Sequence, residues 1–198
     1  MIQKLHRIYS YGVNYFKIKK YASKNLVVRN NINGESKMII IGYQGIDKST
    51  YCRKTIGAID LDDSSCFRDF SGNRPDKWCE TYVKTAIYLN GQGYDVFISS
   101  NKEVRQALLA CHCCSYYRGF KYCAIVPSIN LKDAWIRRLR NIYNNSNSTN
   151  NLEALNSARF NFEESIKDIA NDIDNTFYIT NLNNYDIFTL MHNIKNIM

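Results

Sequence analysis

Hydrophobic and polar positions follow two alternating patterns from Lys37 onward. Short apolar runs are separated by longer segments in which apolar residues recur at helical spacing. The apolar runs predict strands at 37–43, 57–61, 94–99, 122–127 and 176–180. The segments between them predict helices at roughly 48–56, 76–91, 101–114, 130–144, 151–172 and 184–197. Because the strands are apolar on both faces and joined by helices, the pattern favours an α/β fold with a parallel sheet covered on both sides.

The pattern also suggests how the chain is divided. Its 198 residues, 45% of them hydrophobic, fit one compact domain at 37–198, preceded by an extension at 1–36. The stretch NIYNNSNSTNNLEAL (141–155) is polar and rich in asparagine, and it predicts an exposed turn or mobile loop between two helices. We expect it to be the hinge of a lid at about 128–160.

The apolar runs are too short for a membrane protein. The longest lies near residues 38–42, far below the roughly 18 residues that a membrane span needs. The first residues lack the apolar core of a secretory signal. We therefore expect no membrane contact and a cytoplasmic location, the host cytoplasm if the protein is viral.

Charge separates the N-terminal extension from the rest. The net charge is +8, but residues 1–37 hold eight basic side chains against Glu35 alone, a balance of +7. Tyrosines and a phenylalanine are interleaved with these lysines, a mixture that can stack on bases and neutralise phosphates. We favour an amphipathic extension packed on the domain by its aromatic residues. Contact with nucleic acid through residues 1–36 is the alternative.

The segment IIIGYQGIDKSTYC (39–52) carries the clearest chemical signal. An apolar strand leads through a glycine-containing turn to Lys-Ser-Thr at a helix start. In a phosphate-binding loop of this kind, backbone amides surround the phosphates, the lysine adds a charge and the next hydroxyl holds magnesium. The residues that would form the site are Gly42, Tyr43, Gln44, Gly45, Ile46, Asp47, Lys48, Ser49 and Thr50.

One position departs from the motif G-x-x-x-x-G-K-[ST]. Asp47 stands where the motif has glycine before the lysine. A carboxylate about 5 Å from a phosphate adds repulsion of about 3 kcal/mol per unit charge at an effective dielectric near 20. Three interpretations stay open: a weakened but working site, a carboxylate that turns outward or joins the metal shell, or a loop that has lost catalysis.

Four segments together resemble a known family. GYQGIDKST, AIDLDDS, DVFISSNKEVRQAL and LKDAWIRRLR are similar to parts of P-loop NTPases of the nucleoside and nucleotide monophosphate kinase type, including small phage-encoded kinases, over roughly residues 37–182. The resemblance implies a three-layer sandwich with five parallel strands in the order 2-3-1-4-5. It also implies phosphoryl transfer from ATP, with Mg²⁺, to a nucleotide, nucleoside or similar small acceptor.

Acidic side chains follow the second predicted strand. Asp60 and Asp62 alternate along AIDLDD and so point the same way, near the strand end where ligands bind in open α/β sheets. We assign Asp60 a catalytic role and Asp62, with Ser49, a role in holding magnesium; capping of the next turn is the alternative for Asp62.

Arginines supply candidate phosphate contacts. Arg68 and Arg74 lie in a loop that matches the acceptor site of the related kinases, and they could equally be solvated loop residues. Arg105 follows the third strand, where a bidentate guanidinium suits an acceptor phosphate. Arg138, in the predicted lid, is expected to neutralise the transferring phosphoryl group, unless this helix has only a solvated basic face.

The CHCC group at 111–114 looks at first like a metal site. Adjacent residues on a helix point about 100 degrees apart, so the spacing is poor for zinc and favours buried structural thiols. Two functions follow from the sequence: an ATP-dependent kinase, or a binding module with weakened or lost catalysis that contacts nucleic acid or a protein partner.

Overall fold

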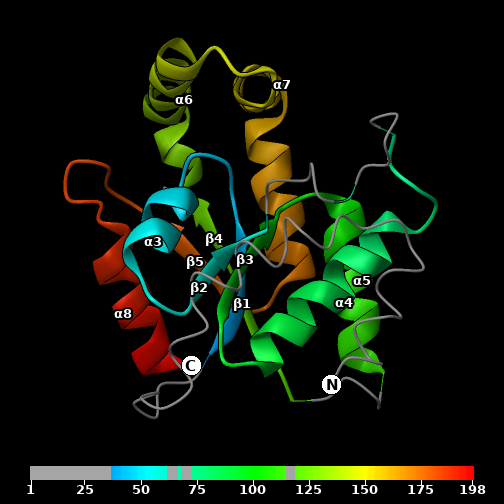
Figure 1. The fold of residues 1–198 in the computed structure, drawn as a ribbon. Coiled ribbons are helices and arrows are strands. Elements are labelled where there is room, and N and C mark those ends of the chain that lie inside the picture. The colour runs from blue at the N-terminus through cyan, green and yellow to red at the C-terminus, as the bar shows by residue number, and fades with distance from the viewer. Residues whose placement is uncertain (1–36, 62–66, 68–72, 115–118) are drawn as a thin grey trace.

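The computed structural model describes residues 37–61, 67, 73–114 and 119–198, and its centre is a five-stranded parallel sheet (Figure 1). The strands are β1 (Met38–Gly42), β2 (Ala58–Asp60), β3 (Asp95–Ser99), β4 (Lys121–Pro127) and β5 (Thr176–Ile179). Their order is β2-β3-β1-β4-β5, which confirms the predicted fold class. All five residues of β1, the central strand, are buried, because helices cover both faces of the sheet.

Helices form the two outer layers. They are α3 (Lys48–Lys54), α4 (Trp78–Gly91), α5 (Lys102–Cys113), α6 (Lys132–Ser146), α7 (Thr149–Asp172) and α8 (Ile187–Ile197), with a short 3-10 helix η4 (Ile129–Leu131) before α6. One face of the sheet is covered by α4, α5 and the C-terminal half of α7, and the other by α3 and α8 (Figure 1). Each predicted helix and strand is present within three residues of its expected bounds.

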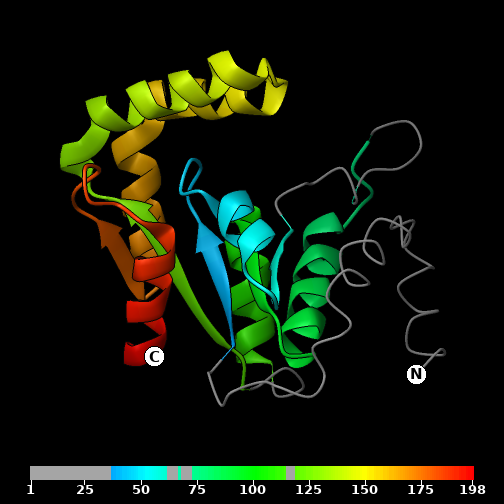
Figure 2. The same cartoon turned by 60° about the vertical axis from the view of Figure 1, so that its left-hand side comes forward.

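Helices α6 and α7 form an arm that extends over the carboxyl end of the sheet (Figure 2). The prediction of a turn or mobile loop over 141–155 is wrong for most of its length, since only Asn147 and Ser148 separate the two helices. Asn147 adopts the left-handed conformation (φ 47°), which asparagine tolerates better than most residues. Leu155 on α7 is buried, so packing of the hairpin outweighs the polar composition.

Further along, α7 bends at Asn161, whose backbone is non-helical. The bend turns the helix from the arm down onto the sheet (Figure 2). An ion pair between Lys132 Nζ and Glu163 Oε1, at 3.1 Å, joins α6 to α7 next to this bend. This pair therefore links the first turn of α6 to α7 at the base of the arm.

Several predictions fall outside the described residues: the extension 1–36, the magnesium ligand Asp62 and the loop residue Arg68. Within the part of the chain that the structure describes, every helix is too short or too polar to cross a bilayer.

Candidate functional site

The bend between β1 and α3 forms the centre of the candidate site. Two of its residues have left-handed backbones, Gly45 (φ 86°) and Asp47 (φ 61°), and these reverse the chain direction within five residues. A Cβ atom on Gly45 would lie 2.8 Å from Leu139 Cδ2 of α6. Glycine is therefore required there both by its φ angle and by the close approach of the arm.

Gly42 lets the lysine of the motif fold back over the bend. A Cβ atom on Gly42 would lie 2.5 Å from Lys48 Cδ and 2.9 Å from Ile46 Cδ1, so any side chain would displace both. Lys48 is only 7% exposed, and its Nζ donates a hydrogen bond to the Gly42 carbonyl at 3.2 Å. The ammonium group is thus held at the end of β1, beside the loop backbone.

Three consecutive carbonyls of the loop are held by side chains from other elements. Trp135 Nε1 donates to the Gln44 carbonyl at 3.0 Å, Arg138 Nε to the Gly45 carbonyl at 2.8 Å, and Tyr185 Oη to the Ile46 carbonyl at 2.7 Å. Burial raises the pKa of Tyr185 well above its usual range, and the Asp47 carboxylate adds to this shift, so the hydroxyl stays protonated and can donate.

These bonds also fix the direction of the loop amides. In a trans peptide the N–H points opposite to the C=O, and the described chain contains no cis peptide bond. The amides of Gly45 and Ile46 therefore point away from α6, and the amide of Asp47 points away from Tyr185. Within the described ranges, none of these three amides donates a hydrogen bond. Unpaired amides grouped in this way make an anion-binding concavity.

Asp47 is neutralised by the arm. Its Oδ2 is in an ion pair with Arg138, whose side chain is 26% exposed, against 38% for that of Asp47. Of the three interpretations, the structure matches a carboxylate turned outward, toward α6. Its positive φ angle also explains why the motif has glycine here, since aspartate is among the few other residues that tolerate this conformation.

A hydroxyl and a carboxylate lie together at the carboxyl end of β2. Ser49, in the first turn of α3, donates from Oγ to Asp60 Oδ2 at 2.8 Å, and Asp60 is the last residue of β2. The structure therefore brings together three residues that the sequence singled out: Lys48, Ser49 and Asp60. Thr50 differs, because its hydroxyl accepts a hydrogen bond from Arg53 within α3.

Arg105 lies in a structural ion pair. It is 3% exposed, with Nε and Nη2 both 2.8 Å from Asp172 Oδ2, and it also donates to the Ser100 carbonyl. The pair ties α5 to the end of α7. A ligand phosphate would have to compete with Asp172 for this guanidinium, so its predicted role in acceptor binding requires a rearrangement.

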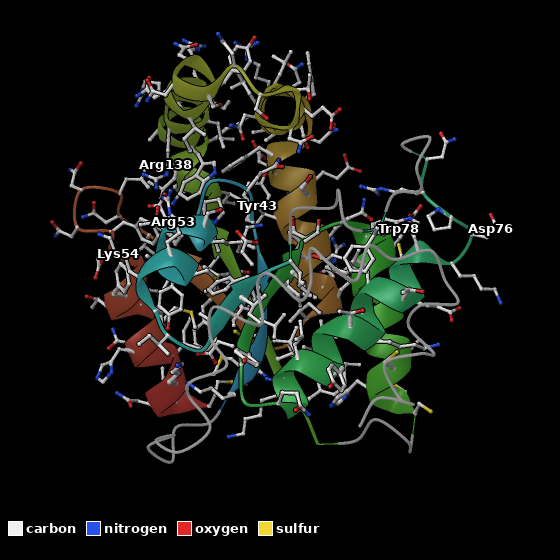
Figure 3. The ribbon with its side chains drawn as sticks, viewed as in Figure 1. Tyr43, Arg53, Lys54, Asp76, Trp78 and Arg138 are labelled. Atoms are coloured by element: carbon white, nitrogen blue, oxygen red, sulfur yellow. The ribbon has the colours of Figure 1, made fainter. Side chains whose placement is uncertain are left out.

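Arg74 is exposed and stacks on Trp78, the first residue of α4. Its guanidinium carbon is 3.8 Å from the centroid of the Trp78 ring, which packs edge-on against Tyr82. Tyr82 Oη in turn accepts a hydrogen bond from the Ser99 amide at the end of β3. In Figure 3, Tyr43 lies between Arg138 on one side and Trp78 on the other. Sequence reasoning found Arg74 but not its aromatic support.

Trp135 and Tyr185 are the contributors that sequence reasoning missed. Trp135 is buried as an apolar residue of α6, but its indole N–H also donates to the loop. Tyr185 comes from the segment between β5 and α8, 139 residues from its partner Ile46. No local pattern marks such a contact.

The CHCC segment lies away from this site, at the end of α5. Cys111 is buried as predicted, but the prediction of buried thiols is wrong for Cys113 and Cys114, which are exposed at the end of the helix. His112 packs against the rings of Phe120 and Tyr122. Among the residues that the structure describes, no three metal-ligating side chains form a group. Comparison of the chain with family models, curated proteins and solved structures found no match.

Proposed function

We propose that the chain is a P-loop phosphotransferase that binds ATP through residues 42–50 and transfers its γ-phosphoryl group to a nucleotide, nucleoside or similar small acceptor. One observation carries the proposal: three consecutive unpaired amides stand beside Lys48 at the end of β1. This is the edge of an open α/β sheet at which ligands bind.

The loop residues would bind the triphosphate. The amides of Gly45, Ile46 and Asp47 donate to phosphate oxygens, and Lys48 supplies a positive charge without leaving the end of β1. The Ser49 hydroxyl is an oxygen ligand of the kind that Mg²⁺ takes in small number while keeping its waters, and the Asp60 carboxylate beside it could accept a hydrogen bond from one of those waters. When bound, the ion neutralises charge on the β- and γ-phosphates.

Transfer needs no covalent enzyme intermediate. An oxygen of the acceptor attacks the γ-phosphorus, the bond from that phosphorus to the β–γ bridging oxygen breaks, and ADP leaves with the electron pair. A phosphate acceptor attacks as an anion and needs no base. A hydroxyl acceptor would pass its proton to a carboxylate, for which Asp60 is the candidate.

The acceptor would approach from the β3 side. Arg74 is exposed and held against Trp78, so its guanidinium can meet an anionic group at little entropic cost. Arg105, buried against Asp172, is the weaker candidate for the same task.

Calorimetric titration of ATP with Mg²⁺ into the full chain tests the proposal. We expect binding to weaken at least about tenfold in Lys48→Ala, since a hydrogen bond to a charged group contributes about 1.5–3 kcal/mol. Lys54→Ala, on the exposed side of the same helix, is the matched control and should bind like the wild type. Equal ATP affinity in the wild type and in Lys48→Ala would refute the role of the loop.

Asp47 favours a second candidate, a nucleotide-binding module with little or no turnover. Its carboxylate is paired with Arg138, but its side chain stays 38% exposed beside a loop that would receive phosphates. A screen of monophosphate acceptors, followed by ADP release, separates the two functions. Binding without ADP formation, together with turnover gained in Asp47→Gly, would favour the module over the kinase.

A further inference from the structure

Asp47 occupies a helix-capping position but caps nothing. It is the N-cap residue of α3, yet its side chain accepts no hydrogen bond from a backbone amide. The other helix N-caps with aspartate or asparagine behave differently. Asn101 accepts from the Glu103 amide at 2.8 Å, and Asp186 accepts from the Thr189 amide at 2.9 Å. The usual tendency of such residues to bond nearby amides is therefore suppressed at Asp47.

Two features keep the Asp47 carboxylate away from those amides. Its left-handed backbone differs from the extended backbone of an ordinary capping residue. Its Oδ2 is also bound by Arg138, which at the same time donates from Nε to the Gly45 carbonyl. One edge of the guanidinium thus binds two residues of the same loop.

We propose that Arg138 is a positioning residue that holds the Asp47 carboxylate out of the phosphate-binding loop, so that the loop amides stay available to a triphosphate. This inference rests on the proposed function. A carboxylate and a phosphate seek the same partners, namely unpaired amides and the Lys48 ammonium group. Without Arg138, the nearest anion to the loop would be its own aspartate, and it would compete with the ligand.

The surroundings of Arg138 suit a fixed role. Its guanidinium carbon lies 5.6 Å from the ring centroids of both Trp135 and Tyr185, the two residues that hold the flanking loop carbonyls. Its neighbours Arg137 and Arg140 are exposed on other faces of α6 and are in no ion pair among the described residues. Helix α6 therefore presents one of its three arginines to the loop.

The same contacts couple the arm to the loop. Gln44 Nε2 donates to the Ala154 carbonyl of α7 at 3.3 Å, and Trp135 donates back to the Gln44 carbonyl. Arg138 is thus one of several links between loop and arm, but the only one among the described residues that carries a charge to Asp47.

Titration of Mg²⁺-ATP into four proteins tests the inference: wild type, Arg138→Gln, Asp47→Gly and the double variant. We expect Arg138→Gln to weaken binding at least tenfold when Asp47 is present and less than threefold in the Asp47→Gly background. Glycine suits the positive φ angle at this position and has no side chain to compete. Arg137→Gln, the matched control, should bind like the wild type.

The outcomes separate this inference from the proposed function. Equal fold-losses from Arg138→Gln in both backgrounds would mean that Arg138 acts on the phosphates directly, and would overturn the inference alone. No loss in either background would overturn it as well. A wild type that binds no ATP would overturn the proposed function and this inference together. Melting temperatures show whether Arg138→Gln still folds. ATP binding that is regained in the double variant shows that the loss in Arg138→Gln came from a blocked loop and not from unfolding.

Discussion

Each end of the sheet carries an aspartate that is in an ion pair with lysine or arginine. The two ends differ in how many of the polar groups around the aspartate have a partner. At the amino end, Asp95 is fully buried, with Oδ2 2.6 Å from Lys195 and 3.6 Å from Lys37, while Oδ1 accepts from the Met38 amide. Strand β1, the start of β3 and helix α8 meet there, so the charges stabilise the junction of three elements.

At the carboxyl end, Asp47 is matched by Arg138, but the backbone next to it is not satisfied. Three loop amides have no partner within the described ranges, and Lys48 lies beside them. A fold leaves polar groups unpaired at a cost, and such groups concentrate where a ligand binds. The charged cluster at the amino end thus has a structural role, whereas the carboxyl end is distinguished by three adjacent loop amides that have no partner among the described residues.

We expect the largest loss of stability when the ion-pair cluster at the amino end of the sheet is broken. Asp95→Asn removes the counter-charge of two largely buried lysines, and breaking a buried pair costs about 3–5 kcal/mol. We expect this loss in urea unfolding, with ATP affinity of the folded protein unchanged. Asp168→Asn, which breaks an exposed pair with Lys102, should cost under about 1 kcal/mol. Equal losses in the two variants would contradict a structural role for Asp95.

A smaller loss of stability is expected at the carboxyl end of the sheet, where Tyr185 holds the loop. Tyr185→Phe deletes the hydroxyl that holds the Ile46 carbonyl and should lower stability by about 0.5–1.5 kcal/mol. Because the Ile46–Asp47 peptide is then less fixed, ATP affinity should also fall severalfold by calorimetry. Tyr178→Phe, on the exposed side of β5, is the control. If it loses as much ATP affinity as Tyr185→Phe, the hydrogen bond from Tyr185 to the Ile46 carbonyl does not explain the effect.

The smallest effect concerns Tyr43, which packs against Trp135 and Phe162 beneath the loop. It is 1% exposed, and its hydroxyl has no hydrogen bond of normal geometry in the described part of the chain. Burial raises its pKa to about 12, although the nearby Gln44 side chain acts to lower it. Tyr43→Phe should raise stability by up to about 1 kcal/mol at neutral pH, because an unsatisfied buried group is removed.

The pH dependence of Tyr43 has a defined sign. The unfolded chain loses this proton above about pH 10 while the folded chain keeps it to about pH 12, so stability falls as pH rises through that window. Tyr43→Phe should flatten the fall in melting temperature between pH 10 and 12. Tyr88→Phe, at the surface, should leave it unchanged; an unchanged slope in Tyr43→Phe would argue against a protonated, buried phenol.

Sequence reasoning succeeded where one segment contains the whole signal. The strands and helices came from apolar periodicity, and so did the strand ends at which Lys48, Ser49 and Asp60 lie. That these three residues bind phosphate stays a prediction. It did less well where a residue's role depends on a distant partner. Arg105 follows β3 as expected, but its partner Asp172 lies 67 residues away. The hairpin at 147–148 shows the same limit, since polar composition suggested a loop and packing made helices.

The sequence by itself determined the parallel sheet and the succession of strands and helices along the chain. It also determined the bend between β1 and α3, with lysine and serine after it. These features follow from burial on both faces and from residue spacing, which act over a few turns of chain. Only the tertiary structure decided that Asp47 faces Arg138 and that Trp135 and Tyr185 hold the loop carbonyls. These contacts join residues 91 to 139 positions apart, and their energies depend on distance in space, which the local pattern does not encode.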